Sequence, residues 1–267
     1  MPAMDSFDDP IIVFDTESTG VDPTEARIVE LGAAHFEGRE FQGPRRALIN
    51  PGVPIPPESS EIHGITDDKV IGKPDFAAVA PRFLEHLQGS RSDGVAPILV
   101  GYNAVAYDVP LINTELARHG MVDAIDANNV LDPIIFVRWS LRHLRRRNLE
   151  SVCAHFGLRL DLAHSAAADA KATGEILFAM IDSGSIPDTP CAAFAEQDRL
   201  RPMLEREWDE YAYWLYKDRE EDVLRMGAGA HCGTPLQDVD PGYLEFLLGK
   251  VADLPEAVRA HFERYAG

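Results

Sequence analysis

Three short segments rich in apolar and β-branched residues most constrain what this 267-residue chain can fold into. The first is the apolar run Pro10–Phe14, and the segments Arg27–Gly38 and Glu40–Pro51 follow it with short connections. Strands joined by short connections pair antiparallel, so these segments predict an antiparallel meander. A further buried strand is predicted at Ile98–Asn103.

Helical patterns alternate with these strands, so the first 180 residues indicate a mixed α/β fold. The apolar residues of Asp75–Leu87 recur at helical spacing. Asp108 is expected to cap a helix that runs to Gly120, and Asn148 to cap a short helix. Ser165 could cap the alanine-rich segment Ala166–Ile181, whose composition strongly favours helix.

The length fits one large domain, or one domain with an appendage. A Pro/Gly/Ser-rich stretch at Asp182–Pro190 predicts a linker. An aromatic, charged, helix-like segment at Phe194–Val223 follows, and a short, mainly helical module ends the chain. The predicted division is therefore 1–182, 183–223 and 224–267. The expected buried residues of the aromatic segment are Trp208, Tyr211, Trp214 and Leu215.

The composition excludes several classes of protein. With 44 acidic side chains against 25 Lys plus Arg, the net charge of −19 argues against a protein that coats nucleic acid. The three cysteines, Cys153, Cys191 and Cys232, form no CxxC and fit neither a disulfide framework nor a zinc knuckle. No apolar run has membrane-spanning length and the acidic start is unlike a signal peptide, so we expect a cytoplasmic protein with no membrane partner.

Carboxylates stand at the ends of the predicted elements. Asp15 and Glu17 follow the first strand two residues apart, so both project from one face. Asp108 stands just past another strand, and Asp169 lies in the first turn of the alanine-rich helix, which His164 precedes. Converging carboxylates repel one another unless cations lie between them, and oxygen ligands suit Mg²⁺ or Mn²⁺ better than zinc. Two such ions can hold a phosphodiester and activate water, with the histidine as proton acceptor.

Each of these residues also has a simpler interpretation. The residues Asp15 to Glu17 could form a turn, and Asp108 could be a helix cap. His164 and Asp169 could be exposed residues at a helix start, where the dipole favours an acid. Spacing does not separate these interpretations, but the joint occurrence of the residues in this order favours the catalytic one.

Three ordered motifs resemble those of the DEDDh 3′–5′ exonucleases, the DnaQ-like superfamily. They are IIVFDTESTG at 11–20, LVGYNAVAYDVPLINTEL at 99–116 and HSAAADAKAT at 164–173. The segments IHGIT at 62–66 and NLESVCAHFGL at 148–158 are also similar to that family, and the resemblance covers about residues 10–182. The chain departs from the family pattern at Tyr102, Tyr107 and Ser18, and none of these is a predicted metal ligand.

The resemblance implies a ribonuclease H-like α/β fold, which is a mixed sheet with an antiparallel meander flanked by helices. It also implies a hydrolase that releases nucleoside 5′-monophosphates from a 3′ end. It implies that His164 positions or deprotonates the attacking water. The implied ligands of two divalent ions, Mg²⁺ or Mn²⁺, are Asp15, Glu17, Asp108 and Asp169. The residues implied to lie near the terminal nucleotide are Thr16, Ser18, His63 and Asn103; for His63, a packed loop histidine is the alternative.

Positive charge is concentrated in Arg138–Arg147, which holds five arginines. Arginine pairs with phosphate through its planar fork, and Trp139 could stack on a base. Arg145 and Arg146 are therefore predicted substrate contacts. The alternative is a solvated helix face with its leucines turned inward, and both can hold at once.

The tail segment His231–Leu248 resembles the small C-terminal module of the exodeoxyribonuclease X branch of the family, although the lysines of that module are absent. The positions that fit are Gly229, Gly233, Leu236, Tyr243 and Leu244. This module is a predicted site for a protein partner.

Together these features predict a metal-dependent 3′–5′ exonuclease that acts on single-stranded or frayed 3′ ends of DNA in repair. The same chemistry on RNA is one alternative, since no residue can be assigned to reading the 2′-hydroxyl. A polymerase-associated proofreading subunit is another. A non-catalytic binding subunit is a third, and the presence of all four carboxylates and His164 argues against it.

Overall fold

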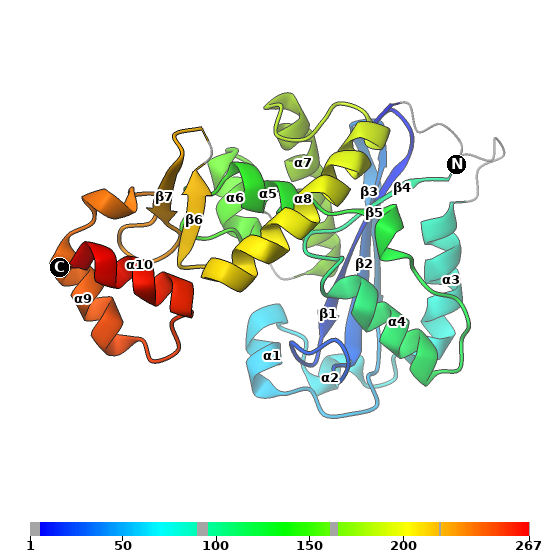
Figure 1. The fold of residues 1–267 in the computed structure, drawn as a ribbon. Helices are drawn as coiled ribbons and strands as arrows, with labels where there is room; N and C mark the ends of the chain where they lie inside the picture. The colour runs from blue at the N-terminus through cyan, green and yellow to red at the C-terminus, as the bar shows by residue number, and fades with distance from the viewer. Residues whose placement is uncertain (1–5, 90–95, 161–164, 219, 267) are drawn as a thin grey trace. The chain divides into compact units, whose positions relative to one another are not determined.

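A five-stranded mixed sheet is the centre of the computed structural model, which describes residues 6–89, 96–160, 165–218 and 220–266 (Figure 1). The strand order is β3-β2-β1-β4-β5. The first three strands pair antiparallel, whereas β4 lies parallel to β1 and β5 parallel to β4. The predicted meander and fold class are confirmed. The strands are β1 Ile11–Ser18, β2 Ile28–Glu37, β3 Glu40–Leu48, β4 Ile98–Val100 and β5 Val130–Leu131.

Helices cover both faces of the sheet (Figure 1). One face packs against α3 and α4 through a buried core that includes Ile12, Phe14 and Leu31. The alternate residues of β1 and β2 face α7 on the other side. The helices around the sheet are α1 Pro57–His63, α2 Asp67–Val70, α3 Phe76–Gln88, α4 Asp108–Arg118, α6 Leu149–His155 and α7 Ala166–Asp182, with a 3₁₀ turn η1 at Ala127–Asn129.

Of the three predicted helix caps, that of Asn148 is confirmed and those of Asp108 and Ser165 are corrected. The carboxylate of Asp75 accepts a hydrogen bond from the Ala78 amide at 2.9 Å, and Asn148 caps α6 in the same way. Asp108 is the first residue of α4 rather than its cap, because Tyr107 occupies the cap position. Ser165 stands at the cap position of α7, but its side chain makes no capping hydrogen bond.

Helix α7 lies close to the sheet because small residues meet at the contact. Ala166, Ala170 and Gly174 are buried on α7. Opposite them, Gly32 of β2 leaves room for the backbone of the first turn of α7, and a Cβ at this position would overlap the backbone of Ala166 and Ala167. The absence of a side chain at residue 32 therefore sets how near α7 comes to β1 and β2.

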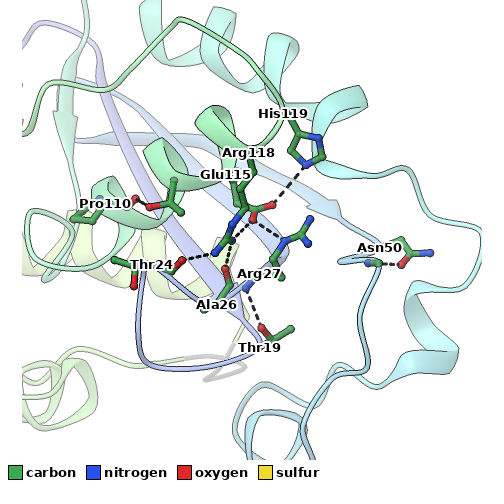
Figure 2. Close-up of polar contacts among 11 residues, drawn as sticks. Thr19, Thr24, Ala26, Arg27, Asn50, Pro110, Glu115, Arg118 and His119 are labelled. Carbon is green, nitrogen blue, oxygen red and sulfur yellow. Dashed lines mark hydrogen bonds and ion pairs between the residues drawn. The ribbon is translucent and has the colours of Figure 1, made fainter.

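A buried carboxylate ties α4 to the segment that follows β1 (Figure 2). Glu115 is 1% exposed and accepts hydrogen bonds from Arg27 Nε at 2.7 Å and Arg118 Nη1 at 2.5 Å. Arg118 also donates to the carbonyl oxygens of Thr24 and Ala26. Burying a carboxylate is costly unless it is paired and hydrogen-bonded, and both conditions are met here. The network fixes residues 24–27 against α4.

The chain forms two compact units. The first comprises Met1–Ile134 and Asn148–Gln197, and the second comprises Ile135–Arg147 and Asp198–Gly267. Two helices hold residues of both units: α5 at Pro133–Ser140 and α8 at Pro190–Tyr211. No described helix is both long enough and apolar enough to cross a membrane.

The second unit has its own core around a two-stranded antiparallel sheet. Its elements are β6 Leu215–Asp218, β7 Val223–Met226, a 3₁₀ turn η2 Leu236–Asp238, α9 Pro241–Lys250 and α10 Glu256–Ala266. The helix-like prediction for Phe194–Val223 is wrong beyond Tyr211, where the helix ends and the hairpin follows. Leu215 is buried as predicted, whereas Trp208 is 59% exposed.

Substituting Gly32→Ala is expected to lower the free energy of unfolding by about 1–3 kcal/mol, because the added methyl group overpacks the contact with α7. Urea denaturation measures the change. Gly249→Ala on α9 is the control, since no atom lies within 4 Å of the added Cβ, and it should be neutral or slightly stabilising. Equal stability of Gly32→Ala and the wild type would contradict the close contact.

Substituting Glu115→Gln is expected to destabilise the first unit by about 1–3 kcal/mol, because both arginines lose a charged acceptor. The urea midpoint of this variant is compared with that of Glu85→Gln, which removes an exposed carboxylate from α3. The two variants should differ clearly. If both shift the midpoint equally, the network around Glu115 does not hold residues 24–27.

Candidate active site

Asp15 and Glu17 lie within β1, which extends to Ser18 rather than ending before them as predicted. Alternate residues of a strand share a face, so both side chains lie on the side of the sheet that α7 covers. Asp15 pairs in register with Gly32, the residue that allows the close approach of α7. The strand and the helix contact thus position the same two carboxylates.

Asp169 comes from the first turn of α7 and meets this pair. Ligand oxygens of Asp15, Glu17 and Asp169 all lie within 4.8 Å of one another. All three side chains are half-buried. Three of the four predicted metal ligands are therefore gathered in one cluster, although they come from two elements more than 150 positions apart in the sequence.

Asp108 lies beside this cluster at the start of α4. Its side chain is 4% exposed, and Oδ1 accepts a hydrogen bond from the Thr16 hydroxyl at 2.6 Å. Burial raises the pKa of Asp108 to about 6, and the hydrogen bond from Thr16 opposes this rise. Asp108 in turn raises the pKa of Asp15, so the two carboxylates interact electrostatically.

Without a cation, the carboxylates of the cluster repel one another strongly. Burial, followed by repulsion from Asp108, Glu17 and Asp169, raises the pKa of Asp15 well above its usual value. Burial and repulsion from Asp169 raise the pKa of Glu17 from 4.5 to about 8. The folded protein thus holds together carboxyl groups that would each prefer to bind a proton.

These residues fit a divalent metal ion. All of the donors are carboxylate oxygens, which hard cations such as Mg²⁺ and Mn²⁺ prefer. The raised pKa values of Asp15 and Glu17 show negative charge that a cation would compensate. Both the donor set and the electrostatics of the cluster agree with metal binding.

Two neighbours of the cluster were missed by the sequence prediction. Glu30 of β2 is fully buried, forms an ion pair with Arg46 and accepts a hydrogen bond from the Ala166 amide at 3.3 Å. Glu30 thereby holds the first residue of α7, which the side chain of Ser165 does not cap. Arg46 lowers the pKa of Glu17 and offsets part of the repulsion. The only signal in the sequence was that Glu30 interrupts the apolar first part of the strand, Ile28–Ala34.

Ser18, a predicted nucleotide-binding residue at the end of β1, is hydrogen-bonded to its neighbours. The Ser18 hydroxyl lies 2.5 Å from that of Tyr107 and 2.8 Å from the Gly20 carbonyl oxygen. Tyr107, which stands where the family commonly has Phe, also donates to Gly20. These contacts give the tyrosine hydroxyl a structural partner that a phenylalanine would lack.

His63 and Asn103 also have local partners. The Nε2 atom of His63 lies 3.2 Å from the Ser18 carbonyl oxygen, and Nδ1 accepts from the Ile65 amide at 3.0 Å. The backbone N–H of Asn103 donates to Asp132 Oδ1 at 2.8 Å. Their contact with a terminal nucleotide stays a prediction.

The arginine-rich segment divides into packed and exposed residues within the second unit. Arg142 forms an ion pair with Glu207, and its guanidinium lies 4.8 Å from the ring centre of Trp139. Arg147 is half-buried and donates to the carbonyl oxygen of Arg142. The exposed members are Arg138, Arg145 and Arg146. Packing therefore explains part of the segment, and contact of Arg145 and Arg146 with substrate stays a prediction.

His164 lies outside the described residues.

A cavity of about 850 Å³ lies between α3 and the face of the sheet that α7 does not cover, and it is lined by Leu31, His86 and Phe83, among others. None of the described residues that line this cavity is a predicted metal ligand. The acidic cluster, and not this cavity, is the candidate active site.

Comparison with known proteins places the segment that holds this cluster among nucleases. Residues 12–177 match the exonuclease family model RNase_T. The chain is 30% identical over 199 residues to DNA polymerase III subunit epsilon of Treponema pallidum, covering 72% of this chain and 86% of that protein. It is 35% identical over 173 residues to a PolC-type DNA polymerase III of Clostridium perfringens. That match covers 65% of this chain but only 11% of the length of the polymerase.

Solved structures show the same fold. Exonuclease I matches with a TM-score of 0.59 at 18% identity, over 94% of this chain and 61% of that one. Exonuclease X in complex with 5′ overhanging duplex DNA matches with a TM-score of 0.53 at 19% identity, over 70% of this chain and 99% of that one. The matched motifs, the acidic cluster and the fold agree, and the chain belongs to the RNase_T exonuclease family, within the DEDDh (DnaQ-like) superfamily of 3′–5′ exonucleases.

Proposed function

We propose that this chain is a divalent-metal-dependent enzyme that hydrolyses the 3′-terminal phosphodiester bonds of DNA and releases nucleoside 5′-monophosphates, in DNA repair. The observation that carries the proposal is the convergence of Asp15, Glu17 and Asp169 in a chain of this exonuclease family. Asp108, beside them on α4, completes the proposed ligand set.

Two Mg²⁺ or Mn²⁺ ions are the proposed cofactors, held by the four carboxylates. When bound, such ions neutralise the charge of the phosphodiester and lower the pKa of water. Of the residues in this chain, Thr16 orients Asp108 through its hydroxyl. Arg46, which is paired with Glu30, lowers the pKa of Glu17 and so favours its charged form. His164 is the proposed proton acceptor for the attacking water.

Two observations support DNA as the substrate. Structural neighbours include exonuclease I in complex with dT13 and dA16 oligonucleotides, and exonuclease X with overhanging duplex DNA. The exposed residues Arg138, Arg145 and Arg146 offer positive charge in an otherwise acidic chain, and phosphate contacts are chiefly electrostatic. Single-stranded or frayed 3′ ends are the proposed form of the substrate.

Proofreading beside a polymerase is a second candidate function. The relative from Treponema pallidum is named as a polymerase subunit, and this chain covers most of its length. The chemistry at the acidic cluster would be the same, and the partner would differ.

The proposed organisation places the exonuclease domain with its catalytic residues at 1–182 and a module similar to the tail of exodeoxyribonuclease X at 224–267. The linker and helical segment at 183–223 between them also holds the strand β6. A protein partner for that module and a cytoplasmic location belong to the same proposal.

Degradation of 5′-labelled single-stranded DNA, overhanging duplex DNA and RNA, side by side with Mg²⁺, Mn²⁺ or EDTA, tests the function. The expected result is a ladder of shortened labelled DNA with either metal and none in EDTA, with nucleoside 5′-monophosphates as products. Cleavage of RNA alone would favour the exoribonuclease alternative. Activity that persists in EDTA would contradict the metal site.

Substituting Asp169→Asn is expected to reduce exonuclease activity to near background, because the cluster loses a charged ligand. The same change should raise the melting temperature of the metal-free protein, since it removes repulsion from Glu17. Activity assays and thermal melts in EDTA measure the two effects, and Asp182→Asn at the exposed end of α7 is the control. An Asp169→Asn variant that is fully active would exclude this residue as a ligand.

The stability of the metal-free protein should fall as pH rises. A carboxyl group with a higher pKa in the folded state binds its proton more tightly there, so its contribution is most favourable below the unfolded-state pKa. For Glu17 the contribution is lost as pH rises from 4.5 towards 8. Melting temperatures in EDTA should therefore drop across this range more steeply for the wild type than for Glu17→Gln. Parallel curves for the two proteins would show that Glu17 is not perturbed.

A further inference from the structure

Gln197 is a fully buried polar residue, and both the oxygen and the nitrogen of its side-chain amide are hydrogen-bonded to the backbone at the end of β5. Its Oε1 accepts from the Asp132 amide at 2.7 Å, and its Nε2 donates to the Val130 carbonyl oxygen at 2.9 Å. Gln197 lies on α8, beyond residues 12–177 that match the exonuclease family model. A residue outside the matched region thus fixes the backbone at Asp132.

The carboxylate of Asp132 in turn binds the backbone of the loop after β4. Asp132 is 1% exposed, and Oδ1 accepts from the amides of Asn103 at 2.8 Å and Ile134 at 3.1 Å. Its Oδ2 accepts from the Val105 amide at 3.1 Å. A buried carboxylate requires such partners, and these three backbone donors provide them. Both oxygens of Asp132 are therefore engaged in holding backbone, and two of the three donors belong to the loop before α4.

This loop leads directly into the first turn of α4. Asn103 has a left-handed backbone with φ of 63°, a conformation that asparagine tolerates better than most residues. Its carbonyl oxygen accepts from the Tyr107 amide at 3.1 Å, and the Ala104 carbonyl oxygen accepts from the Val109 amide at 2.9 Å. Asp108 stands between these two acceptor-bound amides, so the turn held by Asp132 fixes the backbone from which Asp108 projects.

We propose that Gln197 and Asp132 are positioning residues that hold Asp108 in place for metal binding. This inference rests on the proposed function, in which Asp108 is a metal ligand. Neither residue touches the acidic cluster in the contacts described, so the effect passes through the backbone of residues 103–108. The Thr16 hydroxyl then meets Asp108 from β1 and completes its placement.

The competing explanation is that both residues only stabilise the core. The two explanations differ in their effect on the affinity of the folded protein for metal. A purely structural role lowers the melting temperature and leaves metal affinity unchanged below the melting transition. A positioning role also weakens metal binding, because ligands held by their hydrogen-bonded surroundings bind metal about 10- to 100-fold better than ligands left unsupported.

The test uses the full-length protein and titrates Mn²⁺ by calorimetry, well below the melting temperature of every variant. Asp132→Asn removes one carboxylate acceptor, and Gln197→Met removes both hydrogen bonds at nearly the same side-chain volume. Ile186→Ala is the stability control, because Ile186 is buried in the first unit and offers no polar side-chain atom. The expected result is Mn²⁺ binding weakened about tenfold or more in both test variants and unchanged in the control.

The double variant of Asp132 and Gln197 sharpens the test. When two residues act through one network, substituting both lowers the binding free energy by less than the sum of the two single changes. The combined effect on Mn²⁺ affinity should therefore be smaller than the product of the two single effects. If Asp132→Asn does not fold, Gln197→Met carries the test, since it leaves the carboxylate of Asp132 in place.

Unchanged Mn²⁺ affinity in the folded variants would overturn the inference, as would an equal loss in Ile186→Ala. Neither result touches the proposed function if the wild type binds Mn²⁺ and degrades DNA. A wild-type protein that binds Mn²⁺ but degrades no nucleic acid contradicts the function alone. A wild-type protein that binds no Mn²⁺ contradicts both.

Discussion

The close contact between α7 and the sheet is the constraint on which the acidic cluster depends. Gly32 lies opposite Asp15 in the strand pairing and leaves the space that the first turn of α7 occupies. A protein interior is packed densely enough that one added methyl group must move its neighbours. The distance from Asp169 to the carboxylates of β1 therefore depends on Gly32, which has no side chain. The hydrogen bond from the Ala166 amide to Glu30 reinforces the same contact.

This packing works against electrostatics. Asp15 and Glu17 have raised pKa values because the fold holds them in a half-buried cluster with other carboxylates. Strained or repelling groups persist only where the surrounding structure determines their positions independently. Here the surroundings are a strand register, a helix contact and the ion pair between Glu30 and Arg46. Stability is given up at the cluster, and the gain is a site whose repulsion a divalent cation would relieve.

Much of the fold followed from local sequence signals, and so did the identity of the candidate ligands. The meander, the helix over Asp75–Leu87 and the acids at element ends all rest on periodicity and short motifs. Contacts between distant residues could not be predicted in this way. Glu30 is an anionic residue among the apolar residues of Ile28–Ala34, and only the strand register shows that it pairs with Glu17. Gln197 reads as an ordinary polar helix residue until the fold places it against β5. The helix prediction for the aromatic segment was wrong beyond Tyr211, because the apolar residues there suit a hairpin as well as a helix.

The arginine-rich segment has a consequence for how this protein is made. Ile135–Arg147 belongs to the second unit, although the chain then returns to the first unit for Asn148–Gln197. The ion-pair partner of Arg142 is Glu207, 65 positions later, and Cys232 lies 3.8 Å from the His143 carbonyl oxygen, 89 positions later. During synthesis this segment therefore leaves the ribosome before its partners exist, while the residues that complete the first unit are still to come. No single cut in the chain separates the two units, and a shortened gene that ended after α7 would leave the segment without the contacts that cover it.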